Sequence, residues 1–174
     1  MTSEERTLIL DLCLERISES EFLARFPVNP RTEPGYITHE LQNALQTRDA
    51  AAVECATLLG FRYGFSSESA GILCELILAD WHNQHENIAM ALQQLRDPAT
   101  VDCLYEAASM TFAYLDYDES HALAVKCIWA LSAINTALAI ERLRLLAQSG
   151  NPIIRENARR RLLSLDRSGD ARLR

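Results

Sequence analysis

The stretch from Ala122 to Ile134, ALAVKCIWALSAI, constrains the fold of this chain more than any other segment. Eleven of its thirteen residues are apolar, and Lys126 and Ser132 are the exceptions. A helix of this length is too short to cross a bilayer, because each residue adds only about 1.5 Å. Protein must therefore bury it on several sides. We expect this helix in the middle of a stack, with Trp129 in the core, so that Trp129→Ala would cost about 3–5 kcal/mol.

The rest of the chain also has helical patterns and no convincing strand. Only six glycines and five prolines occur in 174 residues, which disfavours a turn-rich β protein. Ser18 precedes Glu21 in a capping-box pattern, and Asp97-Pro98 and Asn151-Pro152 each place a capping residue before a proline. We expect eight to ten helices, near residues 3–17, 18–26, 38–46, 50–63, 69–81, 87–95, 98–112, 122–134, 137–148 and 152–165.

The chain resembles itself at a shift of 39 residues, which indicates a repeated helical hairpin. The expected cap Asp97 falls on the expected cap Thr136. The other matches cover both helices of the unit: Ala91, Leu92, Leu95, Val101, Leu104 and Ala108 fall on Ala130, Leu131, Ile134, Ile140, Leu143 and Ala147. A partial third copy follows at a shift of 31, where Leu123, Cys127, Leu131 and Ile134 match Ile154, Ala158, Leu162 and Leu165.

Over about residues 84–166 this pattern resembles the HEAT-repeat family, whose units are helical hairpins of roughly 40 residues. Val125-Lys126 and Ile154-Arg155 look like the apolar–basic pair of that family, although the leucine alignment places them one residue apart. The resemblance implies an all-α, HEAT-like α-solenoid of antiparallel helical hairpins. Two further hairpins are expected at 38–63 and 67–82.

We expect one domain over residues 1–174. Three prolines and a glycine in 27–36 mark a loop, so that 1–36 would form an N-terminal helical hairpin and loop. Residues 37–166 would hold the helical repeats, and the polar tail 167–174 is expected to fray.

Charge is unevenly distributed along the chain. Residues 1–150 hold 10 basic and 21 acidic residues, and residues 151–174 hold seven arginines and three acids. The two parts therefore carry net charges of −11 and +4, which sum to −7. An acidic body repels nucleic-acid phosphate and attracts basic proteins, although acidity can also serve solubility alone.

The five cysteines are widely spaced, and none forms a CxxC or a Cys/His zinc pattern. We expect them to be reduced, buried thiols. The N-terminal sequence MTSEERTLILDLCLER is acidic where a secretory signal would be basic. No window contains 18 uninterrupted apolar residues, and we infer a cytoplasmic protein.

The segment 80–86, DWHNQHE, is the first candidate site. On a continuous helix, His82 with His85 or Glu86 would share a face and could hold a metal. Alternatively the segment is a turn, with Asn83 as a helix cap and Glu86 completing a capping box. We assign no catalytic, cofactor or metal residue. The residues expected to bind a partner here are Asp80, Trp81, His85 and Glu86.

The segment 114–119, YLDYDE, is the second candidate site. Tyrosine gives contact area at low entropic cost, and carboxylates can bind arginine of a partner protein. The expected contact residues are Tyr114, Asp116, Tyr117, Asp118 and Glu119. The alternatives are a solvated loop with Asp118 as helix cap, or a calcium loop, which would need a glycine and a distal glutamate absent here.

Two basic features have simpler interpretations. Lys126 lies in an apolar helix, and we expect it to pair with a neighbouring acid. The Arg159-Arg160-Arg161 run is expected to be a solvated polar cap, rather than a site for anions or nucleic acid.

The segments DWHNQHENIAMALQQL and YLDYDESHALAVKCIWAL resemble small stand-alone HEAT-like proteins found beside bacterial polymorphic toxins. The resemblance implies a non-enzymatic immunity protein that neutralises its toxin by direct binding in the cytoplasm. An acidic surface suits a basic partner such as a nuclease toxin. The alternatives are a scaffold or assembly factor, or a HEAT-like enzyme of the DNA glycosylase or bilin lyase type. We expect no nucleic-acid or membrane partner, since a glycosylase would need a basic face.

Overall fold

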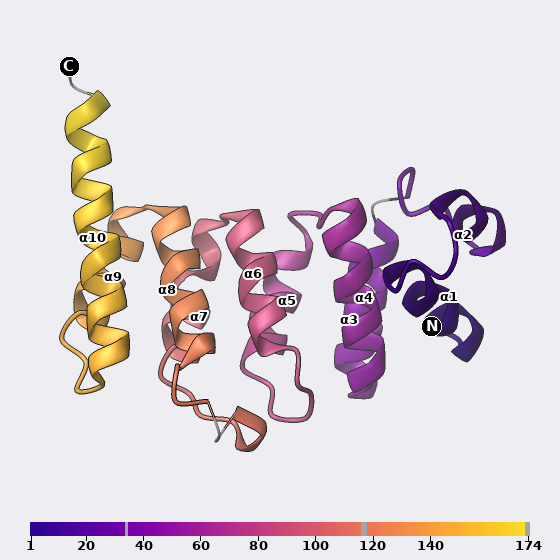
Figure 1. Cartoon of the computed structure of the whole chain (residues 1–174), viewed down its shortest axis with the longest axis horizontal. Coiled ribbons are helices and arrows are strands. Elements are labelled where there is room, and N and C mark those ends of the chain that lie inside the picture. The colour runs from indigo at the N-terminus through magenta and orange to yellow at the C-terminus, as the bar shows by residue number, and fades with distance from the viewer. Residues whose placement is uncertain (34, 116–117, 173–174) are drawn as a thin grey trace.

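The computed structural model describes residues 1–33, 35–115 and 118–172, and within these ranges the chain is helical with no strand (Figure 1). The all-α prediction is therefore confirmed. None of the helices in the described ranges combines the length and apolarity needed to cross a membrane. The helices are α1 Ser3–Cys13, α2 Glu19–Arg25, α3 Gly35–Thr47, α4 Ala50–Tyr63, α5 Ser69–Ile77, α6 His85–Leu95, α7 Val101–Ala107, α8 Ala122–Ile134, α9 Ala137–Leu146 and α10 Pro152–Arg172, with 3₁₀ turns at Pro98–Thr100 and Ala113–Leu115.

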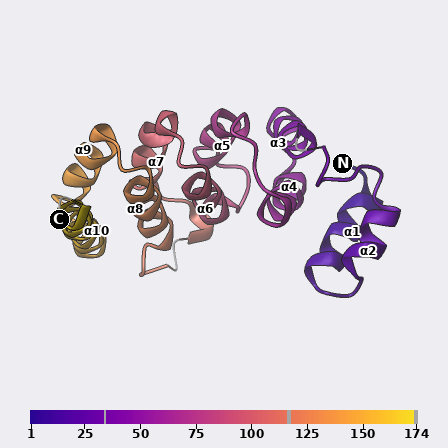
Figure 2. The ribbon, with the colours of Figure 1, turned by 90° about the horizontal axis from the view of Figure 1, so that it is seen from above.

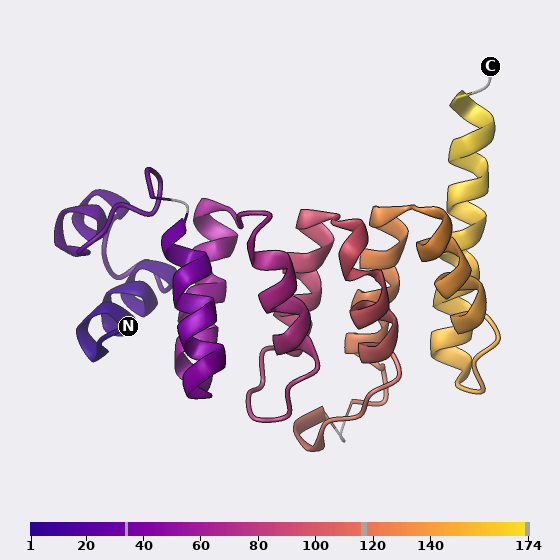
Figure 3. The ribbon, with the colours of Figure 1, turned by 180° about the vertical axis from the view of Figure 1, so that it is seen from behind.

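The helices form two layers (Figure 2). One layer contains α3, α5, α7 and α9, each packed against the next, and the other contains α4, α6, α8 and α10. Helix α1 packs against α4 and α2 at the N-terminal end. The row bends so that α4, α6, α8 and α10 line its inner side, and Figure 3 shows the other layer from behind.

The connections between helices repeat one local device. Arg48, Arg96 and Asn135 each have a left-handed backbone, with φ of 52°, 53° and 53°. The residue after each is a cap, whose side chain accepts an N–H from the next helical turn, as Asp97 does from Ala99 and Thr136 does from Ala139. The left-handed residue stops one helix and the cap starts another, which makes the neighbours antiparallel. The predicted caps Asp97 and Thr136 are confirmed.

Several predicted helix ends were wrong. The first helix is capped by Thr2 with Glu5 in a capping box, so Ser3 is already helical. Helix α5 ends at Ile77 rather than residue 81, and α6 begins at His85 with Gln84, not Asn83, in the cap position. Two histidines explain this, because their side chains bind the carbonyls that a longer α5 would have used. The predicted frayed tail instead continues α10 to Arg172, since extending a helix needs only one more backbone hydrogen bond per residue.

One continuous core of buried apolar side chains lies between the two layers. Helix α8 contributes Leu123, Cys127, Ile128, Ala130 and Leu131, all less than 5% exposed. It packs against α6, α7, α9 and α10, as expected for an apolar helix with many neighbours.

The predicted core position of Trp129 was wrong, because its side chain is 44% exposed. Neighbouring helices cover most of α8, but its inner side faces solvent, and Trp129 lies on that side. The guanidinium of Arg161 lies 4.1 Å from the centre of the Trp129 ring.

The exposure of Trp129 changes the expected energetics of α8. We predict that Trp129→Ala lowers the free energy of unfolding by about 1 kcal/mol, since it removes a cation–π contact and only part of a buried surface. Ile128→Ala, at a fully buried position on the same helix, should cost about 2–5 kcal/mol. Urea denaturation of both variants measures the difference. Equal losses would contradict the position of α8 described here.

The expectation that all cysteines are reduced was also wrong. Cys74 of α5 and Cys103 of α7 form a disulfide, with a Cα–Cα distance of 5.5 Å. The two helices are neighbours in one layer, which brings together residues 29 positions apart. Cys55 and Cys127 are buried free thiols, as predicted, and Cys13 is a free thiol on the surface. Burial raises the pKa of the Cys55 thiol to about 11.

We predict that oxidised protein, denatured without reductant, reacts with N-ethylmaleimide at three cysteines, and at all five after reduction. Mass spectrometry counts the adducts. Cys103→Ser should leave Cys74 reactive and lower the free energy of unfolding by about 2–4 kcal/mol, because the cross-link between α5 and α7 is lost. Five adducts on protein that has been oxidised but not reduced would disprove the pairing.

Candidate functional site

Four connections between helices lie at the same edge of the molecule, at the bottom of Figure 1. We call this the loop edge, and its described residues are 48–49, 78–84, 108–115, 118–121 and 147–151. Side-chain contacts link the neighbouring connections of the loop edge to one another. Arg48 forms an ion pair with Asp80 at 3.5 Å, and the Asn151 amide lies 2.7 Å from Nε2 of His121. Residues far apart in the sequence therefore form one continuous surface.

The two candidate segments predicted from the sequence meet at this edge. The hydroxyl of Tyr114 lies 2.8 Å from Nδ1 of His85, across 29 residues of sequence. The rings of Phe112 and His85 pack together with their centres 3.6 Å apart. The segments 80–86 and 114–119 thus belong to one site rather than two, although Asp116 and Tyr117 lie outside the described residues.

Two buried histidines hold this site together. Nε2 of His82 donates to the carbonyl of Leu76 at 2.8 Å, and Nε2 of His85 donates to the carbonyl of Ala79 at 2.6 Å. Because a carbonyl oxygen only accepts, both rings carry their proton on Nε2, and each Nδ1 is left as an acceptor. Nδ1 of His82 accepts the backbone N–H of Gln84 at 3.1 Å, and Nδ1 of His85 accepts the Tyr114 hydroxyl. Every ring nitrogen therefore has a partner.

Burial sets the protonation of this pair. The rings are stacked with centres 4.4 Å apart, and desolvation lowers the pKa of His85 to about 4. Burial also lowers the pKa of His82. Both rings are therefore neutral at pH 7. Of the two alternatives for this segment, the turn between helices is the one observed, because α5 ends at Ile77 and α6 begins only at His85.

The predicted contact residues differ in their accessibility. Asp80 is 84% exposed and Glu119 is exposed, whereas Trp81 and Tyr114 are half-buried. His85 is fully buried, so its proposed role in contacting a partner is corrected to a structural one.

The acids Glu86 and Asp118 have internal partners. Glu86 forms an ion pair with Lys126 at 2.7 Å, with both side chains 31% exposed, which confirms the predicted pairing of Lys126. Asp118 accepts the N–H of Ala122, the first residue of α8, at 2.6 Å. The N-cap position itself is His121, so the loop alternative placed the helix cap at the wrong residue. The hydroxyl of Ser120, and then this backbone bond, lower the pKa of Asp118, so its carboxylate remains charged.

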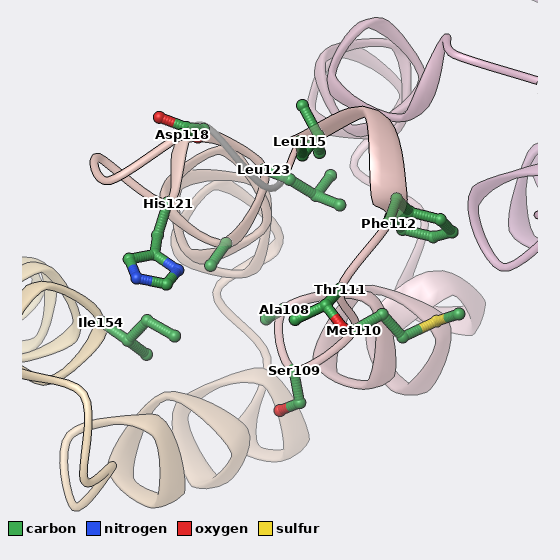
Figure 4. A pocket seen from close by; sticks show the side chains of 11 residues that line it. Ala108, Ser109, Met110, Thr111, Phe112, Leu115, Asp118, His121, Leu123 and Ile154 are labelled. Atoms are coloured by element: carbon green, nitrogen blue, oxygen red, sulfur yellow. The ribbon is translucent and has the colours of Figure 1, made fainter.

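The sequence did not reveal a pocket of about 310 Å³ beside this loop (Figure 4). Its walls are mostly apolar and come from residues 108–115 and from the starts of α8 and α10. Leu115 and Leu123 lie close to each other in Figure 4. Asp118 and His121 add polar groups to the wall. Met110 and Phe112, which lie in a segment that the sequence predicts as the end of a helix, are the available signal. A pocket with apolar walls and a nearby carboxylate can take the stem and the charged head of a basic side chain.

Among the residues that the structure describes, no three His, Cys, Asp or Glu side chains are grouped so that they could hold a metal ion. Comparison of the chain with protein-family models, with curated proteins and with solved structures finds no match. The chemistry of the site therefore has to be inferred from the geometry alone.

The neutral histidines predict a loss of stability in acid. Because the pKa of His85 is about 4 when folded and near 6.5 when unfolded, the unfolded chain binds more protons between these values. The stabilisation is complete above pH 6.5 and is lost as the pH falls toward 4. For His85 it amounts to about 3 kcal/mol. Urea titrations at several pH values measure the loss.

His85→Phe should lower stability at pH 7.5 but weaken its dependence on pH below 6.5. His39→Gln is the control, since the His39 side chain is 66% exposed. The wild type and the control should lose stability in parallel. A His85→Phe variant as acid-sensitive as the wild type would show that the buried ring does not cause the effect.

Proposed function

We propose that the two layers form a HEAT-like α-solenoid. The repeated left-handed residue and cap, at Arg96-Asp97 and Asn135-Thr136, support this, because they lie 39 residues apart at the predicted repeat length. The side-by-side hairpins α3–α4, α5–α6, α7–α8 and α9–α10 support it as well. Solenoids of this kind present extended surfaces for binding other molecules.

We further propose that the chain is a non-enzymatic protein-binding module, an immunity protein that neutralises a bacterial toxin by direct binding. One observation carries this proposal: the loop edge combines exposed Asp80 and Glu119 with half-buried Trp81 and Tyr114, and hydrogen bonds hold the connections of that edge in place. Aromatic anchors on a fixed frame bind proteins at low entropic cost. The carboxylates favour a basic partner, such as a nuclease toxin.

The pocket beside the loop fits the same partner. Its apolar walls and the carboxylate of Asp118 suit an arginine or lysine side chain inserted from a basic surface. This binding mode uses no cofactor, metal, nucleic acid or membrane.

We propose a cytoplasmic location, because an immunity protein must be present where its toxin would act. Disulfides are typical of oxidising compartments. The Cys74–Cys103 disulfide therefore argues against this location. Trapping thiols with an alkylating agent at lysis tests the proposal, because the pair would be reduced in the cytoplasm.

A scaffold or assembly factor with an endogenous partner is the alternative, since it would use the same exposed edge. A toxin gene beside the gene for this chain favours immunity, and its absence favours the scaffold. A HEAT-like enzyme of the DNA glycosylase or bilin lyase type is less favoured, because residues 1–150 carry a net charge of −11, and the buried His85 has no accessible ring nitrogen.

A pull-down with the tagged chain, with and without the adjacent open reading frame, tests the proposal. We predict recovery of a toxin domain, and we predict that Asp80→Arg with Glu119→Arg weakens its binding at least about tenfold, since two exposed carboxylates become repulsive. Mass spectrometry identifies the partner, and surface plasmon resonance measures the affinity.

Glu68→Arg is the matched control for the single variant Glu119→Arg, because Glu68 is also exposed but lies in the α4–α5 connection, at the opposite edge from the loop edge. It should bind like the wild type. Recovery of housekeeping enzymes alone would contradict the immunity role. Equal weakening by the control would show that only net charge matters.

A further inference from the structure

The inner side of the helix row carries large apolar side chains in solvent. Trp129 of α8 is 44% exposed and Met90 of α6 is 39% exposed. The two residues lie 39 positions apart, so they occupy equivalent places in successive repeats. Helices α6 and α8 pack directly against each other. Because exposed apolar side chains occur at equivalent positions of adjacent helices, they form an apolar surface rather than a single isolated exposed residue.

The cation of Arg161 borders this surface. The guanidinium of Arg161 on α10 lies over the Trp129 ring, 4.1 Å from its centre. Within the described part of the chain, no carboxylate lies within ion-pair distance of Arg161, whereas its neighbour Arg160 pairs with Glu156 at 2.9 Å. A guanidinium lying over an aromatic face keeps its N–H donors in its own plane, available to a bidentate carboxylate.

The local charge distribution identifies the ligand. Residues 151–174 hold seven arginines and three acids, although the rest of the chain is strongly acidic. On the neighbouring helices the surface is bordered by the Lys126–Glu86 ion pair, whose two charges offset each other. The charge left to attract a ligand is therefore the positive charge of α10. A ligand for this surface needs apolar side chains for Met90 and Trp129 and a carboxylate for Arg161.

We propose that the inner face of α6, α8 and α10 binds an acidic amphipathic segment of a partner protein. Its apolar side chains cover Met90 and Trp129, and one of its carboxylates binds the guanidinium that Trp129 positions. This surface is distinct from the loop edge and has the opposite charge preference, so it does not depend on the immunity role.

Fluorescence anisotropy with a labelled amphipathic peptide tests the proposal. The peptide carries leucine and phenylalanine on one helical face and glutamate on the other. We expect saturable binding to the full-length protein. Trp129→Ala and Arg161→Glu should each weaken it at least about tenfold, because an aromatic anchor or its charge partner is lost. A peptide with lysine in place of glutamate should bind poorly to the wild type and better to the Arg161→Glu variant.

Arg159→Glu is the matched control. It makes the same change of charge on the same helix, two residues and therefore about 200° around the axis from Arg161. It should retain most of the affinity, and circular dichroism melts should show all three variants folded. Equal weakening by Arg159→Glu and Arg161→Glu, or full affinity in Trp129→Ala, would overturn the proposal. Tight binding of single-stranded DNA that displaces the peptide would overturn it in favour of a nucleic-acid site.

Discussion

Packing of α8 against α6, α7, α9 and α10 is the constraint on which the two candidate surfaces depend. Its buried side chains fill the space between the layers, which fixes the rotation of the helix about its axis. That rotation directs Trp129 to the inner side. It also fixes the first turn of α8, where Asp118 accepts the N–H of Ala122 and His121 contacts Asn151 of the last connection. A change in the core of α8 would therefore disturb the loop edge and the inner face together.

The loop edge is held by hydrogen bonds rather than by apolar packing alone. His82 binds the carbonyl of Leu76 in the last turn of α5, and His85 binds the carbonyl of Ala79 just after that helix. His85 also binds Tyr114 from the next connection. These bonds replace the helical bonds that the chain gives up there. The arrangement requires neutral rings, because each Nδ1 must accept a hydrogen bond. The loop edge therefore keeps its shape at neutral pH, where the rings of His82 and His85 are both uncharged. Protonation of either ring would break one of these hydrogen bonds.

Local signals in the sequence were enough for the parts of the fold that depend on neighbours along the chain. The caps at Asp97 and Thr136, the helical class and the pairing of Lys126 follow from residue type and spacing. The exposure of Trp129 could not be predicted. The apolar composition of α8 indicates that other helices pack around it, but it does not show which side of α8 remains in contact with solvent. The Cys74–Cys103 pair and the His85–Tyr114 bond each join residues 29 positions apart, and only the packing of successive hairpins brings them together. The pocket depends on the same packing.

Net charge is a poor guide to what each surface binds. At physiological ionic strength the screening length is about 8 Å, so a ligand in contact responds to the groups directly beneath it. The overall charge of −7 attracts basic proteins at longer range and sets the rate of encounter. At the loop edge the local charge has the same sign as the whole. On the inner face the arginines of α10 reverse it, and the indole of Trp129 holds one of them in place. The two proposed ligands, a basic protein at the loop edge and an acidic segment at the inner face, are therefore compatible with one net charge.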